Sequence, residues 1–258
     1  MPALQTEATI TVIDLTMAYG EFVIQHDLNF SVKRGDVFII MGGSGCGKTT
    51  LLKHMVGLNK PQKGDVYFGE RSYWQSDEPE QAEIKRQFGV MFQGGALWSS
   101  LTLGENVGLP LHEYTELSAD EINDVVSFKL SLVGLAGYEE FYPAQLSGGM
   151  RKRASLARAI ALDPEILFFD EPGSGLDPFN AKRLDDLILE LRDSLGMTII
   201  VVSHEPASIL RIGSNSIFLD EEKRTMTAYG NPSELIRTAE PKVRAFLNRG
   251  EYTETGKQ

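Results

Sequence analysis

The sequence has a single cysteine, Cys46, so it forms no internal disulfide and no cysteine-rich metal site. Positive charge is also scarce. With 25 Lys+Arg against 36 Asp+Glu the formal net charge is −11, which argues against a protein that binds nucleic acid by neutralising phosphates. No apolar run approaches the roughly 18 residues of a membrane-spanning helix. The first ten residues lack Lys and Arg, unlike a secretory signal. We therefore expect a soluble, acidic protein of the cytosol.

The hydrophobic patterning changes along the chain and predicts two kinds of sheet. With 258 residues, the chain can form one large domain or two small ones. Residues 10–32 alternate between apolar and polar, which is typical of a half-solvated antiparallel sheet. Later, short and nearly continuous apolar runs indicate strands buried on both faces, and hence a parallel sheet covered by helices. These runs are 37–41, 88–92, 166–169 and 198–202.

Helices are expected between these runs. Ser118 and Glu121 fit a capping box at the start of one helix. Asp177 followed by Pro178 begins another, which ends before Gly196. Further helical stretches are expected at 49–56, across 97–162, which shows no strong strand pattern, and in two short helices from Asn231, before a loose end of about seven residues.

One segment matches a phosphate-binding loop, G-x-x-x-x-G-K-[ST]. Its glycines let successive backbone N–H groups face one point, where the next helix also presents its positive end. Lys48 would then reach the β- and γ-phosphates of a nucleotide, and the hydroxyl of Thr49 would ligate Mg²⁺. The segment lies between an apolar strand and a helix, as this mechanism requires. It consists of Gly42, Gly43, Ser44, Gly45, Cys46, Gly47, Lys48 and Thr49.

Polar residues follow the other buried strands where each strand ends. Asp170 and Glu171 come after the run 166–169, and neighbouring side chains on a strand point to opposite faces. One carboxylate can therefore hold Mg²⁺ while the other positions an attacking water. Paired acids at a strand end are otherwise often helix caps, and a lone histidine there is often structural. Gln93 and His204 follow two further runs, and the carboxyl ends of parallel strands share one edge, where α/β proteins bind ligands.

The segment Leu146-Ser147-Gly148-Gly149-Met150 precedes the Asp170–Glu171 strand end. Together with the phosphate loop, Gln93, the segment 174–177 and His204, in this order, it resembles the ATPase subunit of ABC transporters. The resemblance extends over residues 8–230. It implies an α/β fold, the P-loop NTPase ABC cassette, in which helices cover both faces of a mostly parallel sheet, with an antiparallel β subdomain and an α-helical insert.

The resemblance also implies a division of the chain. Residues 1–96 and 163–230 would form a RecA-like ATP-binding core with the antiparallel β subdomain near its N-terminus. Residues 97–162 would form a helical subdomain that carries the LSGG signature. Residues 231–258 would form a C-terminal helical tail.

By the same resemblance, the protein hydrolyses ATP with Mg²⁺. Glu171 is then the catalytic base that polarises water, and His204 contacts the γ-phosphate. Mg²⁺ is held by Thr49, Gln93 and Asp170, and Gln93 also couples the site to a transmembrane partner. Tyr19 would stack on adenine, whereas a lone tyrosine is more usually a packing or surface residue. The residues implied to bind ATP within one subunit are Tyr19, Gly42, Gly43, Ser44, Gly45, Cys46, Gly47, Lys48, Thr49, Thr50 and Gln93.

The resemblance further implies that two copies pair head to tail. Each ATP then lies between the phosphate loop of one copy and the signature of the other. Ser147, Gly148 and Gly149 open an expected helix, whose N–H groups and dipole can face the γ-phosphate across the interface. Asp177 would belong to the loop between subunits. Met150 stands where the family usually has Gln, so a polar side-chain contact is lost there, but we predict a homodimer with two competent sites.

A finer resemblance concerns the partners. The segments 42–47, 93–98 and 105–111, with the LSGGM signature, look like the Mla/Mce-type ATPases. Those energise phospholipid or other lipid transport between bacterial membranes, with a multi-span permease and an MCE-domain lipid-binding protein. We therefore expect a peripheral protein on the cytoplasmic face of the bacterial inner membrane. Leu97 and Trp98 either line the groove that receives a permease helix or pack in the core.

Three other functions stay open at this point. One is an ABC ATPase for another cargo, such as an amino acid or a metal chelate. The second is a soluble ABC protein in DNA repair or translation, although such proteins usually carry two cassettes or long insertions. The third is a P-loop protein that binds nucleotide without turnover, against which the presence of Glu171 and His204 argues.

The acidity is concentrated on one segment. From Glu113 to Glu140 there are seven acidic residues and Lys129, and one minus seven gives −6 of the total −11. We expect this segment to form a solvated outer face of the helical insert. The nucleotide edge is instead basic, with Lys48 in one subunit and the Arg-Lys-Arg run 151–153 beside the opposing signature.

Overall fold

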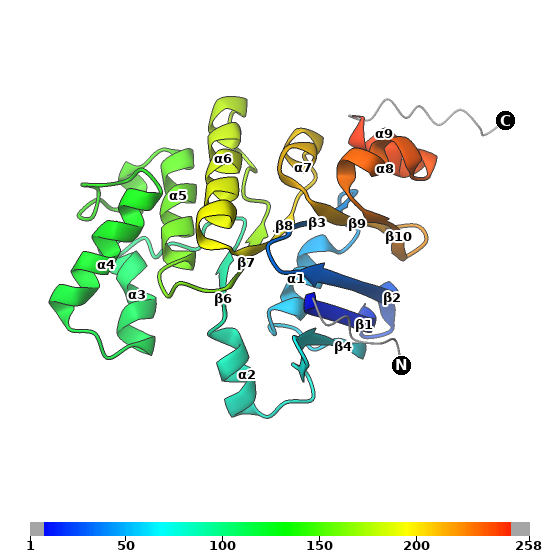
Figure 1. Cartoon of the computed structure of the whole chain (residues 1–258), viewed down its shortest axis with the longest axis horizontal. Helices are drawn as coiled ribbons and strands as arrows, with labels where there is room; N and C mark the ends of the chain where they lie inside the picture. The colour runs from blue at the N-terminus through cyan, green and yellow to red at the C-terminus, as the bar shows by residue number, and fades with distance from the viewer. Residues whose placement is uncertain (1–7, 249–258) are drawn as a thin grey trace.

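The computed structural model, which describes residues 8–248, contains two sheets (Figure 1). An antiparallel sheet has the order β2-β1-β4-β5, and a six-stranded sheet has the order β10-β9-β3-β8-β7-β6. The strands of the first sheet are β1 (Ala8–Tyr19), β2 (Phe22–Lys33), β4 (Lys63–Phe68) and β5 (Arg71–Ser72). Those of the second are β3 (Val37–Gly42), β6 (Phe88–Met91), β7 (Ile166–Asp170), β8 (Thr198–Val202), β9 (Asn215–Asp220) and β10 (Thr225–Gly230). The neighbouring pairs from β6 to β9 are parallel, and only β10 runs antiparallel, so both predicted kinds of sheet are confirmed.

Strand β3 shows why these apolar runs have no polar face. Its side chains alternate between two separate cores. Ile39 and Met41 pack in the core that includes the helical end of the molecule, whereas Phe38 and Ile40 pack in the core shared with the antiparallel sheet. The ring of Phe38 stacks on Phe30 of β2 at 5.3 Å between centroids, which joins the two sheets. Both faces of the parallel sheet are therefore covered.

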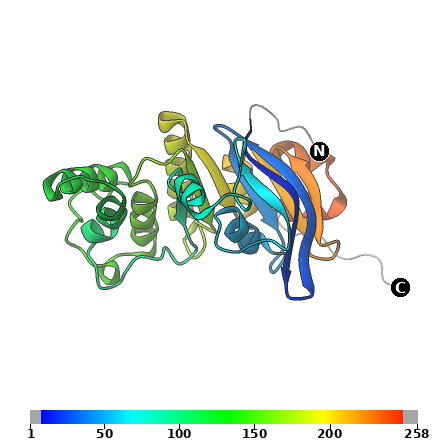
Figure 2. The ribbon, with the colours of Figure 1, turned by 90° about the horizontal axis from the view of Figure 1, so that it is seen from below.

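Helices surround the six-stranded sheet, and α3, α4 and α5 gather at the end of the molecule away from the antiparallel sheet (Figures 1 and 2). Helices α8 and α9 lie beside β9 and β10 (Figure 1). The helices are α1 (Lys48–Met55), α2 (Glu78–Lys85), α3 (Leu103–Tyr114), α4 (Ala119–Leu132), α5 (Gly148–Ala159), α6 (Pro178–Leu195), α7 (Pro206–Ile212), α8 (Pro232–Thr238), α9 (Pro241–Leu247) and the 3₁₀ turn η1 (Pro143–Gln145). None of these described helices is long and apolar enough to cross a membrane.

The expected helix ends are confirmed where capping chemistry marked them. Ser118 caps α4 and forms a reciprocal capping box with Glu121. Asp177 caps α6, which stops at Gly196 in the left-handed conformation at φ 66°. The stretch 97–162 contains helices and no strand, and the two short helices after Asn231 are α8 and α9. The end that was expected to be loose lies outside the described residues.

Helix α2 was not predicted, although its start carries a recognisable signal. Asp77 accepts a hydrogen bond from the backbone of Glu80, and the carboxylate of Glu80 accepts one from the backbone of Asp77. Pro79 occupies the first turn, where proline is tolerated. The helix has only one buried residue, Ile84, so it shows no apolar face that a periodicity search would find.

The acidic segment is exposed, as predicted, apart from one half-buried side chain. Lys129 within it is instead buried, and its ammonium pairs with Asp163. The exposed acidic residues are Glu113, Glu116, Asp120, Glu121, Asp124 and Glu140, and Glu139 is half-buried.

Candidate functional site

The parallel pairing brings four strand ends to one edge of the six-stranded sheet. Strands β3, β8, β7 and β6 are neighbours in this order, and each pair is parallel. Their carboxyl ends therefore point the same way, and the residues that follow them meet there.

The phosphate-binding loop joins β3 to α1 and leaves its backbone donors free. Within residues 8–248, none of the backbone N–H groups of residues 43–45 and 47 donates to a protein acceptor. Lys48 is buried, and its ammonium donates to the carbonyls of Gly42 at 3.0 Å and Gly43 at 2.8 Å. Gly47 has φ 99°, and a Cβ there would lie 2.7 Å from Ile24, so only glycine fits. Free N–H groups, a helix N-terminus and an ammonium together suit a polyphosphate.

Thr49 and Asp170 meet at the start of α1. The hydroxyl of Thr49 donates to Oδ1 of Asp170 at 2.8 Å, and the carboxylate is almost fully buried. A hydroxyl and a carboxylate are hard oxygen ligands of the kind that Mg²⁺ prefers when phosphates complete its shell. Within the described residues there is no group of three or more His, Cys, Asp or Glu that could hold a metal by itself. The pair therefore fits a magnesium that arrives with a nucleotide.

The carboxylate of Glu171 contacts His204. Its Oε1 lies 2.7 Å from Nδ1 of His204, and its side chain is 10% exposed. Its backbone adopts φ 51°, a conformation uncommon outside glycine, and its N–H donates to the carbonyl of Val202 at 3.0 Å. Such strained positions persist where the surroundings fix them and are frequent at functional sites. The two neighbouring carboxylates thus serve two different partners.

Lys152 also lies at this edge, and the sequence did not single it out within the basic run 151–153. We expected that run beside the signature that faces a second copy; within its own chain, Lys152 is buried. Its ammonium donates to the carbonyl of Gln93 and, at 3.4 Å, to the carbonyl of Glu171. Burial lowers the pKa of Lys152, and the charges of Asp170 and Glu171 partly offset this. Lys152 therefore ties the ends of β6 and β7 together.

The two arginines of the same run have local partners. Arg151 donates to the carbonyl of Leu146, and Arg153 donates to the carbonyls of Val133 at 2.8 Å and Gly134 at 2.9 Å. Burial lowers the pKa of Arg153, with a smaller contribution from the charge of Arg183. Within one chain these contacts stabilise the loops around α5.

Two further expected nucleotide ligands, Gln93 and Tyr19, have exposed side chains. The amide of Gln93 is exposed and donates to Oγ of Ser174 at 3.4 Å. Tyr19 is exposed at the end of β1. Both side chains are thus accessible to a ligand.

The signature segment begins α5, far from the phosphate loop of the same chain (Figures 1 and 2). Ser147 is the N-cap, and its Oγ accepts from the N–H of Met150 at 3.3 Å. Ser147 and Gly148 are exposed, and the Met150 side chain packs against the larger core. Asp177 is also exposed, and the side chain of Asn180, followed by backbone N–H groups, lowers its pKa.

A family model described as ABC transporter matches residues 25–174, from β2 through the phosphate loop and the signature to the turn after Glu171. The chain belongs to this family. It is 39% identical over 92% of its length to the intermembrane phospholipid transport ATP-binding protein MlaF of Haemophilus influenzae, of which it covers 89%. It is 37% identical over 91% of its length to MlaF of Escherichia coli, of which it covers 87%.

A second group of relatives in the family carries another name. The probable ribonucleotide transport ATP-binding protein mkl of Mycobacterium tuberculosis is 39% identical over 93% of the chain. The chain spans 66% of the length of that relative.

Solved ABC cassettes share the fold. A dimeric ATP-binding cassette in a post-hydrolysis state, bound to ADP and Pi, superposes with a TM-score of 0.78 at 30% identity and covers 86% of this chain and 98% of its own. CbiO1 from Clostridium perfringens, part of an ABC transporter complex, superposes with a TM-score of 0.82 at 27% identity. The match covers 94% of this chain and 95% of CbiO1. The expected α/β ABC cassette fold is confirmed.

Proposed function

We propose that this chain is the ATP-hydrolysing subunit of an ABC transporter that moves phospholipid or another lipid between bacterial membranes. The observation that carries the proposal is the likeness to MlaF proteins over nine tenths of the chain, joined to a complete set of hydrolytic groups at one sheet edge. The names of the relatives indicate the class of cargo, and the geometry of the site indicates ATP hydrolysis.

Hydrolysis uses the groups at the ends of β3, β7 and β8. Lys48 and the free N–H groups of the phosphate loop bind the phosphates. Thr49 and Asp170, with the amide of Gln93, hold Mg²⁺, which offsets charge on the phosphates. Glu171 accepts a proton from the attacking water, and His204 orients Glu171 and contacts the γ-phosphate.

The site is completed by a second copy of the chain. Ser147 and Gly148, where α5 begins, are exposed. A helix N-terminus there can bind the γ-phosphate of ATP held by the other copy. Residues 97–162 form the subdomain that presents this signature, and Asp177 lies at the contact between copies. The dimeric cassette bound to ADP and Pi supports this arrangement.

Met150 is compatible with two working sites. Its side chain packs against the larger core, so it takes no polar role. The phosphate contacts come from Ser147, Gly148 and Gly149 and do not need the side chain at position 150.

The partners are a transmembrane permease and an MCE-domain lipid-binding protein, at the cytoplasmic face of the inner membrane. Trp98 is 59% exposed and is available to a permease helix, whereas Leu97 packs against the core. A groove of about 310 Å³ lies between α2, β6, α3 and α5 and includes Pro110 and Tyr114, together with one lysine and two arginines. Its aromatic and aliphatic side chains suit the apolar face of an amphipathic helix.

The test is purification of the chain with its native membrane partners, followed by mass spectrometry of the proteins and lipids that copurify. We expect a permease, an MCE protein and bound phospholipid. A Trp98→Ala variant should keep ATPase activity and lose permease association. Copurification of a ribonucleotide carrier without lipid, or of ribosomes or DNA, would overturn the proposal.

A further inference from the structure

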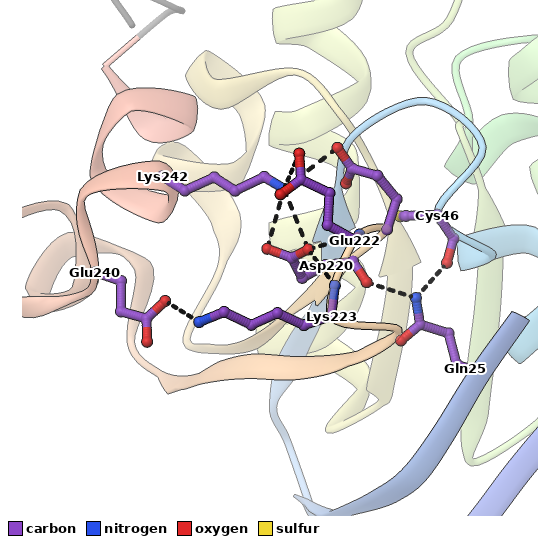
Figure 3. Close-up of polar contacts among 8 residues, drawn as sticks. Gln25, Cys46, Asp220, Glu222, Lys223, Glu240 and Lys242 are labelled. Atoms are coloured by element: carbon purple, nitrogen blue, oxygen red, sulfur yellow. Dashed lines mark hydrogen bonds and ion pairs between the residues drawn. The ribbon is translucent and has the colours of Figure 1, made fainter. Parts of the chain in front are cut away.

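Lys242 connects the C-terminal helix α9 to the turn after β9 (Figure 3). The Nζ atom of Lys242 lies 3.1 Å from both carboxylate oxygens of Asp220. The same atom lies 3.4 Å from Oε1 of Glu221 and 3.7 Å from Oε1 of Glu222. One cation therefore faces three consecutive carboxylates.

Apolar contacts hold Lys242 in this place. Val243 and Leu247 of α9 are buried in the larger core. The ring of Phe246 packs edge-on against Phe218 of β9, with 5.3 Å between centroids. Helix α9 is thus fixed over β9, and the position of Lys242 follows from that packing.

The same turn contacts the phosphate-binding loop. The amide of Gln25 donates to the carbonyl of Cys46 at 2.8 Å and to the carbonyl of Asp220 at 3.1 Å (Figure 3). The carboxylate of Glu221 lies against Gly43, where a Cβ would be 3.2 Å from its Oε2. Glu221 therefore lies between Lys242 on one side and the phosphate loop on the other.

The charge of this turn opposes the binding of an anion. Burial would raise the pKa of Asp220, but hydrogen bonds from the backbone of Lys223, from Lys242 and from the backbone of Glu222 outweigh it and keep the pKa below its ordinary value. Asp220 is therefore ionised, and Glu221 adds a further negative charge beside the loop that receives the phosphates. Lys242 is within 3.4 Å of the carboxylates of both Asp220 and Glu221, whereas Lys223, the lysine of the turn itself, pairs with Glu240 at 2.8 Å.

We propose that Lys242 is a positioning residue of the ATP site, which holds Glu221 beside Gly43 and offsets its charge, so that the C-terminal helix sets the affinity of the phosphate loop for nucleotide. This inference rests on nucleotide binding in the proposed function and not on the lipid cargo. Any partner or modification that draws α9 away from the turn would weaken nucleotide binding.

The test is equilibrium binding of MgADP by calorimetry, which needs neither turnover nor membrane partners, together with KM and kcat for ATP. Lys242→Met should raise the Kd for MgADP and the KM for ATP about threefold to fivefold, with kcat nearly unchanged. Lys242→Arg should restore the wild-type values. The difference should shrink in about 0.5 M salt, where charges are screened.

Lys223→Met is the matched control, because it removes the same charge from the same turn but leaves the Lys242 contacts intact. It should bind MgADP like the wild type. Glu221→Gln should restore binding in Lys242→Met and tighten it about twofold by itself, which keeps the proposal testable if Lys242→Met folds poorly. Equal weakening in both lysine variants, an unchanged Kd in Lys242→Met or no rescue by Glu221→Gln would overturn the proposal. Loss of MgADP binding in the wild type would instead contradict the proposed function.

Discussion

Nδ1 of His204 lies 2.7 Å from Oε1 of Glu171, although the two residues come from different strand ends. The contact fixes the carboxylate that faces the expected water, while the neighbouring Asp170 is bound to Thr49. Two adjacent carboxylates thus contact different partners, and the first two predictions below test the different roles that we propose for them.

His204→Ala should lower the rate of ATP hydrolysis by about 100-fold, because Glu171 loses its orienting partner and the γ-phosphate loses a donor. Binding of MgADP should change by less than about threefold, since in the proposed mechanism His204 contacts the γ-phosphate, which ADP lacks. Phosphate release and calorimetry measure the two effects. Glu205→Gln is the control: its carboxylate lies 3.5 Å from the other ring nitrogen and is 61% exposed, so the variant should hydrolyse ATP normally. Equal losses in both variants would refute the role of His204.

Thr49→Ala should raise the Mg²⁺ concentration needed for half-maximal hydrolysis by about tenfold, because it removes one of the oxygen atoms that we propose as Mg²⁺ ligands. Thr49→Ser keeps the hydroxyl and should behave like the wild type. A magnesium titration of the phosphate-release rate measures this. An unchanged magnesium requirement in Thr49→Ala would show that the hydroxyl holds no metal.

Cys46 should react slowly with alkylating reagents at neutral pH. Burial raises the pKa of its thiol, and the charge of Lys48 only partly offsets this, so the reactive thiolate is scarce until the pH exceeds the ordinary thiol value. Because Cys46 is the only cysteine, mass spectrometry of the intact protein follows the reaction directly. The rate should rise with pH into the alkaline range and reach the rate of a model thiol when the chain is unfolded. Rapid modification of the folded chain at pH 7 would contradict this.

Asp163→Asn should destabilise the fold more than Lys129→Met does. Lys129 is 2% exposed and pairs with Asp163, so removing the acid leaves a buried ammonium without its partner, at about 1–2 kcal/mol. Methionine at position 129 removes the charge and keeps the volume. Asparagine also tolerates the positive φ of 49° at position 163. Urea unfolding measures the free energy of unfolding of both variants. A larger loss of stability in Lys129→Met than in Asp163→Asn would show that the ion pair itself stabilises the fold little.

The sequence predicted the parts of the fold and of the site that rest on local patterns. Buried strands followed by polar residues indicated the edge where Lys48, Asp170, Glu171 and His204 gather, and capping chemistry indicated the ends of α4 and α6. The roles of individual site residues stay predictions until the variants are measured.

The contacts that the sequence could not predict join residues far apart in the chain. Lys152 lies in a run of basic residues, which is typical of an exposed surface, but the packing of α5 against β6 buries it against two backbone carbonyls. Likewise, no local pattern relates Lys242 to Asp220, because their contact depends on how α9 packs over β9. The charge pattern of a sequence does not show whether a charged side chain is buried or which residues it contacts. The contacts of Lys152 and Lys242 could therefore not be predicted from the sequence.

The most direct test of the ATPase mechanism compares wild type with Glu171→Gln, in a complex with the native partners, by phosphate release and by MgATP binding. Glutamine keeps the shape of the side chain but cannot accept the proton of the attacking water. We predict that hydrolysis falls by at least about 100-fold while MgATP still binds at wild-type affinity or more tightly. Hydrolysis by Glu171→Gln at the wild-type rate would contradict the assignment of Glu171 as the base.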